Sequence, residues 1–250
     1  MLFPLSDDDK DLMSPAWVTI GLIVINIAVF LYQIANPEFQ FAYSAIPLEI
    51  TKGVDLIDPQ AIRAGGEMIA IPQAPGPSPI QFTLLSAMFM HGGWMHLAGN
   101  MLYLWIFGDN VEHRFGSLKF LAFYLVSGLA ASFAHIILAP DSVIPTLGAS
   151  GAISGVLGAY LVLFPRNRVM AMLFYRVVAI PAVLVLGLWA VMQIFSGFGG
   201  LAEIGTKGGV AYAAHVGGFI AGVTAGIIAR IFVKHEPPNA FKNIYNRELR

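Results

Sequence analysis

The chain has 250 residues, of which 57% are hydrophobic and 12% charged, and its mean hydropathy is +0.71. Because roughly a quarter of the residues in a soluble domain are charged, this composition excludes an ordinary soluble enzyme. Cysteine is absent, and 14 basic residues face 15 acidic ones. These counts exclude a disulfide-stabilised scaffold, a thiolate metal site and a polybasic nucleic-acid binder, which leaves a protein of the lipid bilayer.

Six apolar stretches without Asp, Glu, Lys or Arg are long enough, or nearly long enough, to cross a membrane. About 20 helical residues span the hydrocarbon core of about 30 Å. The stretches are residues 15–34, part of 84–108, 120–138, 148–164, 177–195 and 210–229. The predicted fold is therefore an all-α membrane protein, a bundle of six transmembrane helices with a short fourth helix.

The predicted membrane domain covers residues 15–232 and has a long first outer loop at about 36–82. Residues 1–14 and 233–250 are expected to be a cytoplasmic N-terminal segment and a cytoplasmic tail. Part of the outer loop is apolar, so we expect it to lie partly on the membrane surface and not to form a separate domain.

The distribution of basic residues predicts the orientation. Six crossings place both termini on one side, and the other side then holds only Lys52, Arg63 and Lys207 of the 14 basic residues. By the positive-inside rule, the termini are predicted to be cytoplasmic. The N-terminal residues are acidic, with no positive region of a cleavable signal or transit peptide, so we expect a prokaryotic plasma membrane.

Polar residues inside the apolar stretches are costly to bury and point to function. Five of them fall in the outer halves of the three segments that enter from outside: His91, His96, Asn100, Ser150 and His215. His96 and Asn100 are four residues apart and share a helix face. We expect the five side chains to converge at one depth, whereas His135 lies on a segment of opposite direction and favours a structural role.

Small residues predict that the fourth and sixth segments touch. They recur every four residues in two rows, Gly151, Gly155 and Ala159 in one and Ala214, Gly218, Gly222 and Gly226 in the other. Such rows let helix backbones approach closely, although ordinary membrane packing produces them too. This contact would bring Ser150 beside His215.

The fourth segment is short, about 22 Å from Ser150 to Phe164. Residues 145–149 are therefore expected to be irregular backbone below the membrane surface, which is tolerated where it lines a watery cavity or is buried in protein. A turn of the type Gly148-Ala149-Ser150-Gly151 at a helix start presents a hydroxyl beside free backbone N–H groups. An active site or a transport site fits this arrangement.

Four motifs in this order resemble those of the rhomboid family of intramembrane serine proteases. They are His96-Leu97-Ala98-Gly99-Asn100, Glu112-His113-Arg114-Phe115-Gly116, Gly148-Ala149-Ser150-Gly151, and Ala214-His215 followed by Gly218 and Gly222. The resemblance covers about residues 82–230. It implies a serine endopeptidase that hydrolyses peptide bonds in or near transmembrane helices of other membrane proteins, with small residues at the cut and helix-weakening residues beyond it.

The resemblance also implies the roles of individual residues. Ser150 would be the nucleophile and His215 its general base, and the oxyanion would be held by the Ser150 N–H with the side chains of His96 and Asn100. The residues expected to support this site are His91, Gly148, Gly151 and Gly218. No metal or organic cofactor is expected, because side chains and backbone supply attack, proton transfer and oxyanion binding.

One departure from the family leaves the orientation of His215 open, since Ser154 stands where some rhomboids have a Tyr that packs on the catalytic His. Gln193 and Trp189, one turn apart, fit either a substrate-facing gate or plain packing. Two other function classes compete with the protease: a non-catalytic protein that binds membrane helices, and a small transporter with a broken helix. The presence of both Ser150 and His215 favours the protease over the first, and the lack of charged residues in the spans counts against the second.

Overall fold

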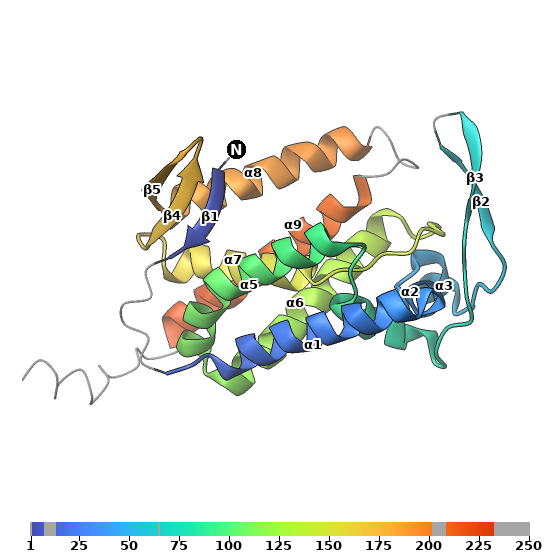
Figure 1. The fold of residues 1–250 in the computed structure, drawn as a ribbon, viewed down its shortest axis with the longest axis horizontal. Helices are drawn as coiled ribbons and strands as arrows, with labels where there is room; N and C mark the ends of the chain where they lie inside the picture. Colours follow the sequence, from blue (N-terminus) through green and yellow to red (C-terminus); the bar gives the residue numbers. More distant parts are fainter. Residues whose placement is uncertain (1, 8–13, 65, 202–208, 233–250) are drawn as a thin grey trace, which may run out of the picture.

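The computed structural model describes residues 2–7, 14–64, 66–201 and 209–232, so the predicted tail at 233–250 lies outside the described residues. The described part is mostly helical (Figure 1). In chain order the helices are α1 (Trp17–Ala35), α2 (Pro37–Tyr43), α3 (Pro47–Lys52), η1 (Ile80–Phe82), α4 (Thr83–Ser86), η2 (Ala87–Phe89), α5 (Trp94–Phe115), α6 (Ser117–Leu138), α7 (Ser150–Leu163), α8 (Ala182–Leu201) and α9 (Gly209–Phe232).

Six of these helices, α1, α5, α6, α7, α8 and α9, overlap the six apolar stretches. Within the described residues, three of them are long and apolar enough to cross a membrane: α1, α6 and the Tyr212–Phe232 part of α9. The stretch Ala182–Phe195 of α8 is a shorter apolar helix in the described part of the chain, as is α7, and α5 ends in a polar turn that contains Glu112 and Arg114. A mostly helical chain with membrane-compatible helices is thus confirmed, while the number of crossings stays a prediction.

Helix α7 lies at the centre of the bundle and packs closely against α9 (Figure 1). A Cβ atom built on Gly218 would collide with the backbone oxygen of Gly151, and one built on Gly222 would collide with that of Gly155. The two glycine rows therefore meet backbone to backbone, as predicted for the fourth and sixth segments. A Cβ atom built on Gly155 of α7 would in turn lie 2.4 Å from the Ser127 Cβ of α6, so this glycine also lets α6 approach α7.

A three-stranded antiparallel sheet lies at one end of the bundle (Figure 1). Its strand order is β1 (Leu2–Ser6), β4 (Arg168–Leu173) and β5 (Arg176–Pro181). The prediction of a helical segment over 177–195 is wrong at its start, because 177–181 pairs with β4 and α8 begins only at Ala182. The run stays apolar from the strand into the helix, so hydropathy alone does not separate the two, although Pro181 stands at the boundary.

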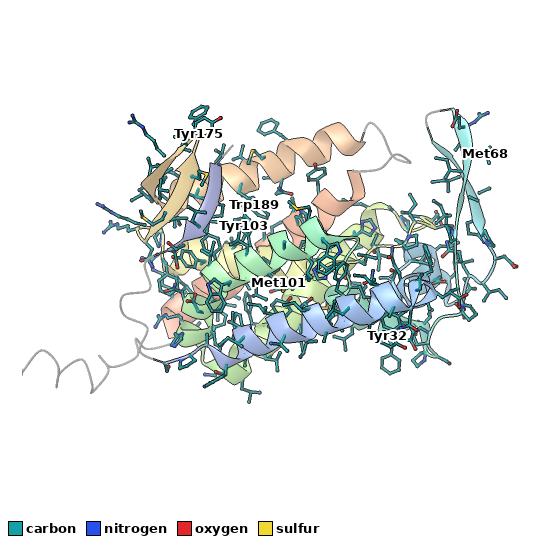
Figure 2. All side chains as sticks on the ribbon, in the orientation of Figure 1. Tyr32, Met68, Met101, Tyr103, Tyr175 and Trp189 are labelled. Carbon is teal, nitrogen blue, oxygen red and sulfur yellow. The ribbon has the colours of Figure 1, made fainter. Side chains whose placement is uncertain are left out.

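The outer loop contains a second piece of sheet, the antiparallel hairpin of β2 (Gln60–Ala64) and β3 (Glu67–Ile71). The sequence analysis predicted no strands there. Figure 2 shows Met68 on this hairpin and Tyr175 at the free end of the β4–β5 hairpin, at opposite ends of the molecule. Both side chains are exposed, 66% and 100% respectively.

Strand β1 is tied to the bundle by Asp7, which follows it directly. Its carboxylate accepts hydrogen bonds from the Tyr160 hydroxyl of α7 and from Asn110 Nδ2 of α5. Asn167, just before β4, donates to the same Tyr160 hydroxyl at 3.3 Å. The start of the chain is thus fastened to the end of α7 that lies opposite Ser150.

Candidate functional site

The structure brings Ser150 and His215 together. Ser150 is the first residue of α7, and His215 lies in the N-terminal part of α9. The His215 Nε2 atom is 2.8 Å from the Ser150 Oγ atom, a hydrogen-bond distance. Because the glycine rows hold α7 and α9 in contact, the backbone itself fixes this distance.

The second ring nitrogen of His215 contacts a third helix. Its Nδ1 atom lies 2.7 Å from the Oε1 atom of Gln193 on α8. The His215 ring is flanked by the rings of Trp189, 6.2 Å away, and Tyr212, 6.4 Å away. These two side chains surround the imidazole in this chain.

Ser154 does not orient His215. Its hydroxyl donates to the backbone oxygen of Ser150, four residues earlier, at 2.6 Å. This is the bond to its own helix that a serine in a membrane helix commonly makes. The Trp189 and Gln193 pair, which sequence reasoning left between a gate and packing, is what contacts the imidazole.

His96 lies against the loop that precedes Ser150. Its Nδ1 atom accepts a hydrogen bond from the Gly92 N–H at 3.3 Å, which leaves Nε2 to carry the ring proton. A Cβ atom on Gly148 would lie 3.0 Å from His96 Nε2 and 3.5 Å from Ser150 Oγ. Gly148 also has a φ of +134°, so glycine suits this position for two independent reasons.

Asn100 and His91 are both buried nearby. Asn100 is 8% exposed, and its Nδ2 atom has no hydrogen-bond partner within the described part of the chain. His91 is fully buried, and its backbone N–H and C=O both bond to the side-chain amide of Gln33. The His91 ring packs edge-on against that of His96 at 5.1 Å. The Asn100 Nδ2 group is thus a hydrogen-bond donor without a partner in the described part of the chain, and the His91 ring packs against the His96 ring.

A cavity of about 280 Å³ opens beside Ser150 and His215. Its walls are the irregular backbone from Ile144 to Gly148, as expected for the segment before the short helix, and small side chains of α6 and α7. His135 of α6 lines it too. A second cavity of about 270 Å³, mostly apolar, lies between α8 and α9 and is lined by Trp189 and Gln193.

The outer loop holds the backbone that leads to Ser150. Ala45 and Thr146 exchange two backbone hydrogen bonds of 3.0 and 2.9 Å, and the Thr146 hydroxyl adds a third to the Ala45 oxygen. Gln73 Nε2 donates to the Val143 oxygen at 2.9 Å, and the Leu48 N–H donates to the Ser142 oxygen at 3.0 Å. Residues far apart in the sequence therefore fix the turn that presents the serine.

Glu112 has a structural task that sequence reasoning missed. Its carboxylate accepts hydrogen bonds from the backbone N–H groups of Val18 and Thr19, at 3.1 and 2.7 Å, and from the Thr19 hydroxyl at 2.9 Å. Helix α1 has Ala16 at its N-cap, which cannot satisfy these N–H groups. The missing cap was the signal that a partner from elsewhere was needed.

Within the described ranges, no three His, Asp or Glu side chains gather as a metal site would require. The site itself offers a hydroxyl hydrogen-bonded to an imidazole, N–H donors nearby without a protein partner among the described residues, and a cavity beside them.

Comparison with known proteins matches residues 80–232 to the Rhomboid domain model. The chain is 36% identical over 142 residues to the rhomboid protease GluP of Bacillus subtilis, which covers 57% of this chain and 25% of that protein. It is 31% identical over 150 residues to the mitochondrial rhomboid protein 1 of Saccharomyces cerevisiae, covering 58% and 41%.

A RHOMBOID-like protein 5 of Arabidopsis thaliana is 37% identical over 81 residues, which is 32% of this chain and 26% of that protein. The chain thus matches less than half the length of each of these relatives. Only the first of these three relatives carries the word protease in its name. Evidence for catalysis in this chain therefore comes from the geometry of Ser150 and His215.

Proposed function

The chain belongs to the Rhomboid family, and from this membership and its site we propose that it is an intramembrane serine endopeptidase with a Ser150–His215 dyad. The observation that carries the proposal is the 2.8 Å hydrogen bond between Ser150 Oγ and His215 Nε2 beside a cavity. A protein that only binds membrane helices needs neither residue, and a hydroxyl hydrogen-bonded to an imidazole is the pair that nucleophilic catalysis requires.

In the first step, Ser150 Oγ attacks the scissile carbonyl carbon while His215 Nε2 takes the hydroxyl proton. The tetrahedral intermediate collapses when the protonated imidazole passes that proton to the leaving amine. The new amino terminus departs and the acyl group remains as an ester on Ser150. Water then attacks the ester with His215 as base, which releases the carboxylic acid and restores the hydroxyl.

The negative charge that develops on the carbonyl oxygen needs donors aimed at it in advance. We assign these to the Ser150 N–H at the start of α7, His96 Nε2 and Asn100 Nδ2. The position of the Ser150 N–H at a helix N-terminus supports the first, because such N–H groups have no partner in the helix. The bond from Gly92 to His96 Nδ1 supports the second, and the unpartnered, buried Asn100 Nδ2 in the described structure supports the third.

His91, Gly148, Gly151 and Gly218 have supporting roles in this proposal. His91 packs on His96, and Gly148 makes room for the His96 ring. Gly218 lets α9 touch the Gly151 backbone of α7, so a side chain at Gly218 would separate Ser150 from His215, whereas a Cβ on Gly151 would collide with Ala131 of α6.

The substrate class we propose is a single-pass or other transmembrane protein, cut within or beside its helix. A helical peptide bond is shielded by its own hydrogen bonds, so the substrate must unwind before Ser150 reaches it. We further propose six crossings, formed by α1, α5, α6, α7, α8 and α9, with both termini cytoplasmic. A prokaryotic plasma membrane stays a prediction, since the relatives include a mitochondrial protein.

The test is labelling of the purified protein in detergent by a fluorophosphonate, which reacts with activated serines. We expect wild type to be labelled and Ser150→Ala and His215→Ala to lose the signal. Ser154→Ala is the matched control, because that serine lies one turn away on the same helix and bonds only to its own backbone. It should be labelled like wild type.

Cleavage of a transmembrane peptide should follow the same pattern in these four proteins. Proteolysis that survives in folded Ser150→Ala would contradict the mechanism. A folded wild type that neither labels nor cleaves would favour the non-catalytic or transport alternative.

A further inference from the structure

A dyad leaves one question open, namely what fixes the imidazole of His215. For Nε2 to accept the Ser150 proton, the ring proton of neutral His215 must be on Nδ1. That proton needs an acceptor, because an imidazole whose Nδ1 has none is free to adopt the other tautomer. In the other tautomer Nε2 carries a proton and cannot act as a base toward Ser150.

Gln193 supplies such an acceptor. Its Oε1 atom lies 2.7 Å from His215 Nδ1, while Ser150 Oγ lies 2.8 Å from Nε2, so the imidazole is held from both sides. The three residues come from three helices, α7, α8 and α9. An amide oxygen accepts hydrogen bonds and never donates them, so this contact selects the tautomer with the proton on Nδ1.

The surroundings limit how else the ring could turn. Trp189, one turn before Gln193 on α8, packs at 6.2 Å from the His215 ring and at 5.8 Å from the Phe219 ring. Tyr212 meets His215 edge-on from its own helix. The side chains of α8 thus hold the imidazole by one polar contact and one aromatic contact.

We propose that Gln193 is the positioning residue for His215, so that the site is a Ser150–His215–Gln193 arrangement with a neutral third member. This inference rests on the proposed protease function. A neutral amide fits a membrane interior, because a carboxylate in the same place would be a buried charge whenever the imidazole is neutral. Cysteine proteases of the papain type use an asparagine side chain in an equivalent role.

The proposal has a chemical consequence for the proton transfer. When His215 accepts the Ser150 proton it becomes an imidazolium, and its Nδ1–H then bonds more strongly to the Gln193 oxygen. Gln193 therefore stabilises the charged ring during the reaction more than the neutral ring before it. Loss of Gln193 should lower kcat and leave KM nearly unchanged.

The first test compares Gln193→Met, which has similar length and no acceptor, with wild type in cleavage of a transmembrane peptide. We expect kcat to fall by about 100-fold, the usual scale for losing a preset hydrogen bond at a catalytic group, with KM within about twofold. Val191→Met is the matched control, because it introduces the same side chain on the same helix at an exposed position. It should keep the wild-type kcat.

The second variant, Gln193→Glu, separates positioning from packing. A glutamate keeps an acceptor at the same place, so kcat should recover in large part, and its negative charge should move the lower limb of the pH–rate profile to higher pH. The other titratable groups that face this region are His96 of α5, His135 of α6 and Tyr212 of α9, and the described residues that line the two cavities include no carboxylate.

A wild-type kcat in folded Gln193→Met, or a Gln193→Glu variant whose pH–rate profile coincides with that of wild type, would overturn the proposal. If Gln193→Met fails to fold, as judged by gel filtration and thermal unfolding, the profile of Gln193→Glu decides alone. Ser150→Ala in the same experiment keeps the two hypotheses apart. If Ser150→Ala cleaves the peptide as wild type does, the protease proposal is refuted. If cleavage requires Ser150 but is unchanged in Gln193→Met, only the positioning role of Gln193 is refuted.

Discussion

At the scale of single residues, Gly148 controls the geometry around Ser150. We expect Gly148→Ala to reduce fluorophosphonate labelling by about 100-fold, because the new Cβ would push against the ring of His96 and the backbone would be strained at a φ of +134°. Such strain costs about 1–3 kcal/mol, so the thermal midpoint should also fall by a few degrees.

Gly99→Ala is the control for this change. A Cβ at Gly99 on α5 would meet nothing within 4 Å, and alanine favours a helix. Labelling of Gly99→Ala should equal that of wild type. Equal labelling of Gly148→Ala would mean that the His96 ring has room to move and does not depend on the glycine.

We expect Glu49 in α3 to make the free energy of unfolding depend on pH. It is 2% exposed, and its burial raises the pKa of the carboxyl from 4.5 to about 6, with Asp55 adding to the rise and the Leu56 N–H opposing it. Between pH 4.5 and 6 the folded protein therefore holds a proton that the unfolded chain has released. Stability should fall as pH rises through this window, by about 2 kcal/mol in total.

The Glu49→Gln variant tests this assignment. Glutamine stays neutral and keeps an oxygen for the Leu56 N–H, so the variant should be more stable than wild type at pH 7.5, by up to about 2 kcal/mol. The measurement is the unfolding midpoint in detergent at pH 4.5 and 7.5. If wild type and variant lose the same stability between the two pH values, another group is responsible.

Sequence reasoning at this scale reached Ser150, His215, His96 and Asn100, because each is a polar residue in an apolar stretch at a matching depth. It could not assign Gln193. Which side of α8 faces His215 depends on how that helix is rotated and tilted, and a uniformly apolar helix carries no periodic pattern that reveals this.

At the scale of elements, the contact of α7 with α9 is the feature on which the site depends. Gly222→Ala would place a Cβ against the Gly155 backbone, which has no side chain that could move aside. We expect a loss of about 3 kcal/mol in unfolding free energy, together with weaker fluorophosphonate labelling, as the helices separate. Circular dichroism melts in detergent measure the first effect.

Gly21→Ala on α1 provides the comparison for Gly222→Ala. Its Cβ would meet nothing within 4 Å, so stability should stay within about 0.5 kcal/mol of wild type or rise slightly. Similar melts for the two variants would show that the close approach of α7 and α9 is dispensable.

The loop before Ser150 depends on the outer loop. Thr146→Val removes the hydroxyl that donates to the Ala45 oxygen at 2.7 Å, so about 1 kcal/mol of stability should be lost. Because this loop sets the position of Ser150, kcat should fall several-fold too. Thr224→Val is the control, since that hydroxyl bonds within its own helix. An unchanged kcat in Thr146→Val would show that the Thr146–Ala45 hydrogen bond does not affect catalysis by Ser150.

Sequence reasoning at the element scale predicted helices at the six apolar stretches, the fourth of them short, and the contact of the fourth with the sixth. It missed both pieces of sheet. The start of the run at 177–195 pairs as β5, and the signals for this, the β-branched Val177, Val178 and Ile180 followed by Pro181, were not used because the whole run is apolar. The pairing of β1 depends on a partner far along the chain, which local pattern cannot reveal.

At the scale of the whole molecule, the proposed crossings place the two hairpins on opposite sides of the membrane. The chain has no cysteine, so a single introduced cysteine is an unambiguous probe. In intact cells, a membrane-impermeant maleimide should label Met68→Cys, and it should label Tyr175→Cys only after the membrane is opened. Both positions are exposed, so accessibility within the protein does not limit either reaction.

Labelling of both cysteines from the same side would contradict the six-crossing arrangement. The reverse pattern, with Tyr175→Cys labelled in intact cells, would keep the crossings and invert the orientation. Composition predicted the membrane class of this molecule, whereas its sidedness rests on a few basic residues and needs this measurement.

Strand β1 pairs with a strand that is synthesised much later in the chain. Its partner is β4, with Leu2 opposite Leu173. The ribosome makes β1 before β4, and the hydrogen bonds between the two strands cannot form until the chain has been synthesised past α7. Throughout that interval the strand has an unsatisfied edge, and long-range pairing of this kind is slow to form. A bulky tag fused ahead of Leu2 is therefore expected to interfere with biogenesis more than with the finished protein.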